Sequence, residues 1–138
     1  MNRPIKLLAL IALCFARPAH AQFTFTHRDT LPQKVVQRAL DAYNHHDVVA
    51  LEAEYLPMYM YQNMADSSAP HLVSAVAVRD SLILVFQRSK DAKQRLSKRV
   101  LTGPIVTDFY TTILNGRKKK HVDMYEVRHG KIVREWEY

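Results

Sequence analysis

Two aspartates interrupt strand-like stretches in the second half of the chain, where carboxyl groups could transfer protons. Asp108 lies within residues 105–114 and Asp123 within residues 118–127, and apolar and aromatic residues recur in both stretches. A strand residue that faces a core is rarely a bare carboxylate, because an unpaired buried charge is costly. We therefore expect both acids on the concave face of a sheet. The alternative is that either one faces solvent, since a shift of one residue reverses the face.

Polar and aromatic side chains recur at a spacing of two around these acids and on an earlier strand. This spacing places them on the same strand face, because successive side chains of a strand alternate between its two sides. Ordinary strand positions with satisfied polar tips are the alternative reading for such tyrosines. The residues expected to bind a ligand are Tyr59, Tyr61, Asn63, Tyr110, His121 and Tyr125.

Histidines near acids raise the question of a metal site. His45 and His46 are adjacent, and neighbouring helical residues do not face together. His121 and Asp123 share one strand face, yet no third ligand has suitable spacing. Because a zinc site needs three or four convergent donors, we expect neither a metal nor another cofactor.

The first 21 residues have the three-part pattern of a secretory signal peptide. Arg3 and Lys6 precede an apolar run at 7–16, and Ala19-His20-Ala21 is a small-x-small cleavage site. The run is too short to span a bilayer, which takes about 20 residues, so no stable membrane anchor is expected. A lipoprotein site at Cys14 is disfavoured because Leu13 precedes it. We expect cleavage after Ala21, a periplasmic or secreted location, and one domain at 22–138.

The composition limits the choice of partners. The net charge is +7 and three of the 20 Lys and Arg residues lie in the leader, which also holds the only cysteine. The remaining cations gather at 88–99 and 117–120, where we expect a solvated loop and a hairpin tip. Binding to nucleic acid is not expected, because no aromatic residues suited to base stacking are interleaved with these cations.

Helical patterns fill much of the first half of the domain. A first helix is predicted after Thr30, which would cap it with Gln33 as the reciprocal partner and Pro32 in its first turn. Asp47 is expected to cap a second helix that ends at Pro57. A strand at 58–64, a polar loop at 65–71 and a third helix at about 74–87 follow.

The second half is typical of an antiparallel meander. The predicted strands are 96–101, 105–114, 118–127 and 131–137. Asn115-Gly116 and His129-Gly130 separate the last three, and such dipeptides favour the two-residue turns of β-hairpins.

Three segments resemble the SnoaL-like branch of the nuclear-transport-factor-2-like (NTF2-like) superfamily. They are the helical phrases at 39–51 and 78–82 and the closing hairpin at 125–138, although Ser74 stands where the family often has glycine. The resemblance implies an α+β fold in which a curved antiparallel β-sheet wraps around three N-terminal helices and leaves a cone-shaped pocket. It also implies a homodimer formed through the outer face of the sheet.

Ketosteroid isomerases on this fold use a base carboxylate, together with a tyrosine and a protonated aspartic acid as oxyanion donors. By alignment the base position is Gln62 and the tyrosine position is Ala39, and only the acid remains, as Asp123. Because Gln62 cannot accept a substrate proton as a carboxylate does, this chemistry is not expected.

Limonene-epoxide hydrolases offer a closer local resemblance. Their water-holding Tyr and Asn correspond to Tyr61 and Asn63, the base to Glu137 and the acid to Asp108. The family's arginine two residues before the acid is Val106 here. The catalytic candidates implied by these comparisons are Asp108, Asp123 and Glu137.

The role expected from the resemblance is that this single domain binds a small, largely apolar molecule in the cone. Three functions remain open from the sequence. The first is a hydrolase or isomerase that uses the acids named above. The second is a non-catalytic carrier or sensor with the same pocket. The third is an interaction module whose cone is filled by side chains and whose outer sheet face binds a partner.

Overall fold

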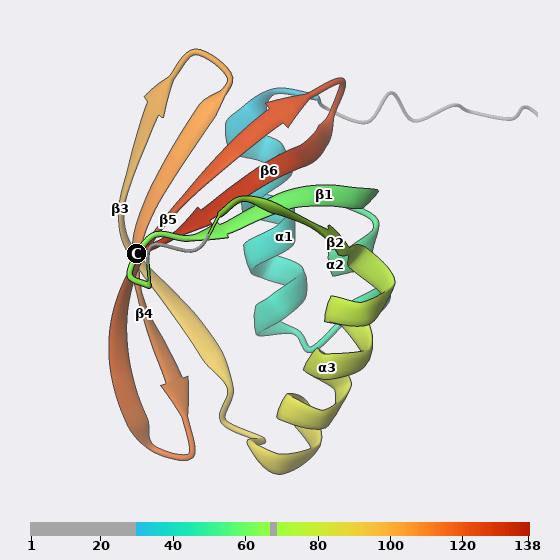
Figure 1. The fold of residues 1–138 in the computed structure, drawn as a ribbon. Helices are drawn as coiled ribbons and strands as arrows, with labels where there is room; N and C mark the ends of the chain where they lie inside the picture. Colours follow the sequence, from blue (N-terminus) through green and yellow to red (C-terminus); the bar gives the residue numbers. More distant parts are fainter. Residues whose placement is uncertain (1–29, 67–68) are drawn as a thin grey trace, which may run out of the picture.

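The computed structural model describes residues 30–66 and 69–138, which fold as helices packed on one curved sheet (Figure 1). The expected signal peptide lies outside the described residues. The elements in chain order are α1 (Pro32–Asn44), α2 (Val48–Glu52), β1 (Tyr55–Asn63), β2 (His71–Ser74), α3 (Ala75–Arg88), β3 (Lys93–Thr102), β4 (Ile105–Leu114), β5 (Arg117–Arg128) and β6 (Lys131–Glu137).

The first two helices begin in different ways. Leu31 is the N-cap residue of α1 and makes no side-chain capping bond, so the predicted cap at Thr30 is wrong. Pro32 can open the helix without one, because its missing N–H leaves one fewer donor to satisfy. The predicted cap of α2 is confirmed, since Asp47 accepts a hydrogen bond from the Ala50 N–H at 2.9 Å. That helix ends at Glu52, and Pro57 lies within β1 instead of ending the helix.

A short strand, β2, occupies part of the segment expected to be a loop. It pairs antiparallel with β1, with His71 opposite Tyr61 and Ser74 opposite Met58. Ser74 ends the strand and also caps α3, accepting a hydrogen bond from the Ala77 N–H at 3.5 Å.

The sheet has the strand order β2-β1-β6-β5-β4-β3. Its neighbours are antiparallel except for β1 and β6, which run parallel, so the sheet is mixed where an antiparallel sheet was expected. A parallel pair needs a long crossover connection. Here the whole segment from β2 to β5 provides it.

Irregular register bends the sheet. Bulges or shifts occur between Leu96 and Lys98, between Glu126 and Val127, and in the pairing of β1 with β6. Such irregularities increase local twist and bending. Figure 1 shows the three helices on one side of the resulting curved sheet. The α+β architecture inferred from the sequence is confirmed.

Two groups of buried side chains hold the helices to the sheet. The larger joins α1 to the middle of the sheet and consists of Val35, Val36, Ala39, Val106, Tyr125, Val127 and Ile132. The smaller lies where α1, α3 and the start of β3 meet and consists of Tyr43, Phe86 and Ala92. The helices therefore meet the sheet at two separate places.

The turn between β4 and β5 is tied to the loop after α3. Asp91 accepts hydrogen bonds from the backbone N–H groups of Asn115 at 2.8 Å and Gly116 at 2.6 Å. Ser89 donates to Asp91 at 2.7 Å and accepts from Asn115 at 2.8 Å. We call this group, Ser89 and Asp91 with the backbone of 115–116, the Asp91 clamp.

The basic stretch expected to be a loop mostly forms β3, which is an edge strand of the sheet. Lys93, Arg95 and Lys98 on this strand are exposed, and its pairing with β4 is interrupted at Ser97.

Candidate functional site

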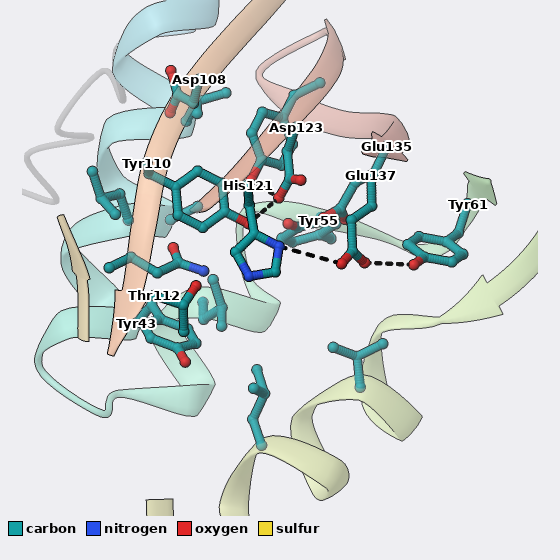
Figure 2. Close-up of a pocket in the computed structure, with 18 of the residues that line it drawn as sticks. Tyr43, Tyr55, Tyr61, Asp108, Tyr110, Thr112, His121, Asp123, Glu135 and Glu137 are labelled. Carbon is teal, nitrogen blue, oxygen red and sulfur yellow. Dashed lines mark hydrogen bonds and ion pairs between the residues drawn. The ribbon is translucent and has the colours of Figure 1, made fainter. Parts of the chain in front are cut away.

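A cavity of about 1310 Å³ lies between the helices and the concave face of the sheet. Its walls come from all three helices and from every strand described above. This volume exceeds the ~300–1,000 Å³ of common small-molecule pockets. Figure 2 shows polar side chains from β1, β4, β5 and β6 directed toward one another at its inner end.

Asp123 is a buried acid at the inner end of the cavity. It is 3% exposed. Its Oδ2 accepts hydrogen bonds from the Tyr110 hydroxyl and from the Tyr125 hydroxyl, the latter at 3.1 Å. Its Oδ1 has no hydrogen-bond partner among the described residues. One oxygen of this buried carboxyl is therefore left without a hydrogen bond from the described residues.

The pKa of Asp123 is raised to about 6, from an ordinary value of 3.8. Burial is the main cause, because a low-dielectric surrounding disfavours the charged form. The hydrogen bond from Tyr110 opposes this effect, and the negative charge of Glu137 adds to it. The same environment raises the pKa of Tyr110 well above its ordinary value.

Glu135 is a second perturbed acid, and the sequence reasoning missed it. It lines the cavity on β6, opposite Tyr125 on β5. Burial raises its pKa to about 8, and the charge of Asp123 adds to the increase, while a hydrogen bond with Tyr55 opposes it. Glu135 lies two residues before Glu137, so the spacing of two that linked the other candidates could have identified it.

Glu137 connects β1, β5 and β6 at the inner end. The Tyr61 hydroxyl donates to its Oε2 at 2.7 Å, and His121 Nδ1 lies 3.5 Å from its Oε1 (Figure 2). Burial, followed by the charge of Lys119, lowers the pKa of His121, and Glu137 opposes this. The His121 ring also stacks on Tyr110, with 5.4 Å between ring centroids.

Asp108 has a partner that the sequence reasoning did not assign. Arg99, directly opposite it on β3, donates from Nε to Oδ1 and from Nη2 to Oδ2, both at 2.6 Å. Arg99 also donates to Gln37 at 2.9 Å and to the Gln33 carbonyl at 3.2 Å on α1. With both oxygens bound by an arginine, Asp108 fits a structural ion pair better than the proton donor expected from the epoxide-hydrolase resemblance.

The remaining predicted ligand residues divide into two groups. Tyr59, Tyr61, Tyr110, His121 and Tyr125 all line the cavity. Asn63 does not. Its side-chain oxygen accepts a hydrogen bond from the Ala65 N–H at 2.9 Å, so it stabilises the turn after β1. The expected pairing of Tyr61 with Asn63 around one water is therefore not formed by this geometry.

The described residues contain neither a metal-binding cluster nor a membrane-spanning helix. Within 30–66 and 69–138, no three His, Cys, Asp or Glu side chains are placed to hold a metal ion together. In the same part of the chain, no helix has the length and apolar character required to cross a bilayer.

Comparison with known proteins supports the fold but not a specific activity. No known family model matches the sequence, and no curated protein matches it. An uncharacterised cystatin-fold protein from Novosphingobium aromaticivorans is similar in structure, with a TM-score of 0.68, 14% identity, and coverage of 78% of this chain and 97% of that one.

Two other solved structures extend the comparison. IdmH from Streptomyces antibioticus, a proposed polyketide cyclase, gives a TM-score of 0.62 at 17% identity, covering 78% of this chain and 90% of its own. A protein with a ketosteroid isomerase-like fold from Catenulispora acidiphila was solved in complex with trimethylamine. It gives a TM-score of 0.60 at 14% identity, and the match covers 75% of this chain and 83% of that one. At these identities the likeness shows a shared fold.

Proposed function

We propose that this chain, which has the NTF2-like fold, binds a small, largely apolar molecule in its cone and transfers a proton on it. Asp123 is the proposed base. The neighbouring structures support ligand binding in general terms, since they include a proposed polyketide cyclase and a protein that holds trimethylamine.

The observation that carries this proposal is the free oxygen of Asp123. Asp123 lines the cavity, and one of its oxygens has no hydrogen bond from the described residues, so this carboxyl can serve as the acceptor of a proton from a molecule bound beside it. Its pKa of about 6 leaves it mostly ionised at neutral pH but more basic than an ordinary aspartate. Perturbed acids in a cleft are typical of catalytic sites.

Glu135 supplies the complementary acid. With a pKa of about 8, it is mostly protonated at neutral pH, whereas Asp123 is mostly ionised. Two carboxyls whose pKa values differ in this way can act as base and acid on one substrate. The pair suits removal of a proton from a carbon next to a carbonyl, while the carbonyl oxygen receives a hydrogen bond from Glu135.

The geometry favours this isomerase-like reaction over epoxide hydrolysis. The hydrolase arrangement requires Asn63 at the cavity and Asp108 free to donate a proton, and neither condition is met. A non-catalytic carrier would use the same cavity and stays the second candidate. The interaction module was expected to have a cone filled by side chains. A cavity of about 1310 Å³ does not fit that expectation.

The test begins with a thermal-shift screen of apolar ketones against the purified domain. A compound that raises the melting temperature is then incubated with the protein in deuterated water, and loss of its α-proton signal is followed by NMR. We expect exchange with the native domain, and binding without exchange with Asp123→Asn. The exposed Asp41→Asn serves as the matched control. Binding without exchange by the native domain would favour the carrier.

We also propose export, with cleavage after Ala21, on the basis of the leader pattern alone. Expression of the full chain in a bacterial host and N-terminal sequencing of the periplasmic fraction test this directly. Recovery of the protein with Met1 intact would contradict it.

A homodimer through the outer face of the sheet is part of the same proposal. Phe109 faces away from the cavity and is 36% exposed. Partly exposed apolar side chains on the neighbouring strands include Val122, Met124 and Trp136. Such a face suits a homodimer contact, because contiguous apolar surface favours association.

A further inference from the structure

The cavity wall formed by β5 changes charge along its length. Every second residue of this strand lines the cavity, and from the hairpin end inward these residues are Arg117, Lys119, His121, Asp123 and Tyr125. The two cations are exposed at the outer end, while the aspartate and tyrosine are buried. The wall is thus cationic at the mouth and acidic inside.

The neighbouring strand reinforces the acidic inner end. Glu137 on β6 lies opposite Asp123, and Glu135 lies opposite Tyr125. The outer positions of β4 have no charge, since Leu114 is opposite Arg117 and Thr112 is opposite Lys119.

The mouth cations of β5 are available to a ligand. Among residues 30–66 and 69–138, no carboxylate lies within ion-pair distance of Arg117 or Lys119. Lys119 also lowers the pKa of His121, so its charge acts on the cavity. Arg79, on the helical side of the cavity, differs because it pairs with Glu52 and Asp80, both at 2.9 Å. Lys118 contributes a further cation at the hairpin end.

We propose that the ligand is an elongated molecule with a carboxylate at one end, held at the mouth by Arg117 and Lys119. Its middle is apolar, and its far end carries a carbonyl or hydroxyl group that reaches Asp123. This inference rests on the proposed function of the same cavity and names the substrate class.

Distance and charge fix both the length and the orientation of such a ligand. Lys119 and Asp123 are four residues apart on one strand, which corresponds to roughly 13 Å. The reverse orientation would place an anion beside Asp123, Glu135 and Glu137, where like charges repel. Apolar side chains of the helices, including Leu40, Leu51 and Leu82, line the space that the middle of the ligand would fill.

The experiment measures displacement of the uncharged dye phenylnaphthylamine, whose fluorescence rises in apolar cavities. The competitors are ω-hydroxy fatty acids of graded chain length and their methyl esters, which differ only in the terminal charge. We expect each acid of suitable length to displace the dye roughly 1.4- to fivefold better than its ester, the range for an exposed ion pair. Added salt should reduce this preference.

The matched variants are Arg117→Ser/Lys119→Ser and Lys120→Ser. The double variant should lose most of the preference for the acid, although it keeps Lys118 at the hairpin end. The second should retain it, because Lys120 is exposed on the same strand but does not line the cavity. Equal displacement by acid and ester in the native domain, or an unchanged preference in the double variant, overturns this inference and leaves the proposed function standing. Failure of the dye and of every competitor to bind overturns both.

Discussion

At the scale of single residues, the inner carboxyls make stability depend on pH. The ordinary pKa of Glu135 is 4.5 and its folded value is about 8. In this interval the folded state binds more protons than the unfolded state, so the free energy of unfolding falls as pH rises. The buried carboxyl of Glu135 therefore lowers the stability of the domain at alkaline pH.

Replacing Glu135 with Gln should remove this fall in the free energy of unfolding at alkaline pH. Relative to the native domain, we expect Glu135→Gln to gain roughly 2–4 kcal/mol in the free energy of unfolding between pH 4.5 and pH 9, because the amide carries no charge to bury. Urea denaturation at several pH values measures it. Asp41→Asn, at an exposed site on α1, should leave the pH profile unchanged. Parallel profiles for the native domain and Glu135→Gln would contradict the prediction.

The Arg99–Asp108 pair should behave as a unit. Arg99→Met leaves Asp108, which is 3% exposed, without its partner, and we expect a loss of about 3–5 kcal/mol in the free energy of unfolding. The double variant Arg99→Met/Asp108→Leu should regain most of that loss, since no buried charge remains. Chemical denaturation of both variants provides the measurement. Additive losses would show that the two residues are not coupled.

At the scale of elements, two glycines with left-handed backbone mark the hairpin turns. Gly116 has φ of 73° and Gly130 has φ of 72°. A Cβ at Gly116 would meet nothing within 4 Å, whereas one at Gly130 would lie 2.8 Å from the Thr30 Cγ2. The two turns therefore share a backbone conformation but not a packing environment.

Alanine substitutions should separate the cost of the left-handed backbone from the cost of crowding Thr30. Gly116→Ala is expected to lower the free energy of unfolding by about 1–2 kcal/mol, the usual penalty for this conformation. Gly130→Ala should lose roughly 1 kcal/mol more, because the added methyl group crowds Thr30. Thermal or urea unfolding of the two variants gives the comparison, and equal losses would indicate that Thr30 moves aside freely.

The Asp91 clamp should control the mobility of the β4–β5 turn. Asp91→Ala removes the acceptor of the Gly116 N–H and leaves the Asn115 N–H with the Ser89 hydroxyl alone, so we expect amide hydrogen exchange to speed up by about tenfold at Gly116 and by less at Asn115. Hydrogen bonds from Ser89 and the turn amides lower the pKa of Asp91 below 3.8. Its stabilising effect is therefore present above pH 3.8 and is lost as pH falls through the lowered value.

Hydrogen exchange measured by NMR at individual amides checks both the effect of Asp91→Ala and the pH dependence of the Asp91 contribution. Amides at the turn between β5 and β6 provide an internal control, because the clamp does not contact them. Unchanged exchange at 115–116 in Asp91→Ala would show that the β4–β5 pairing alone holds the turn.

At the scale of the whole molecule, the proposed dimer predicts an effect for a single outer residue. Phe109→Asp should shift the domain toward monomer, because it places a charge at an apolar contact. Light scattering coupled to size-exclusion chromatography measures the mass. Leu84→Asp, at an exposed site on α3, should not change it. A native domain that is monomeric at all concentrations would rule out this interface.

The sequence predicted most of the architecture because local signals agree with the fold. The bounds of β4 and β6 were predicted to the residue, since Gly116 and Gly130 mark the turns beside them. The four-residue β2 was missed because so short a strand has no measurable alternation. The parallel pairing of β1 with β6 depends on the path of the chain between them, which no local pattern encodes.

The candidate site was harder to predict for a similar reason. Arg99 was not matched to Asp108 because their pairing depends on the register of β3 against β4, which follows a bulge. Asn63 was placed in the pocket by its spacing, but it lies at the last position of β1 and bonds to the turn that follows. A strand pattern identifies the face of a side chain and not its depth.

The two edge strands of the sheet differ in how readily another chain could pair with them. β2 is only four residues long, and β3 is ten residues long with exposed Lys93, Arg95 and Lys98. A strand with free backbone groups can recruit further copies and start a fibril, and charged side chains oppose this. Any molecule that added to β3 would bring its own lysines and arginines alongside the first set, so open-ended polymerisation is disfavoured at this end of the sheet.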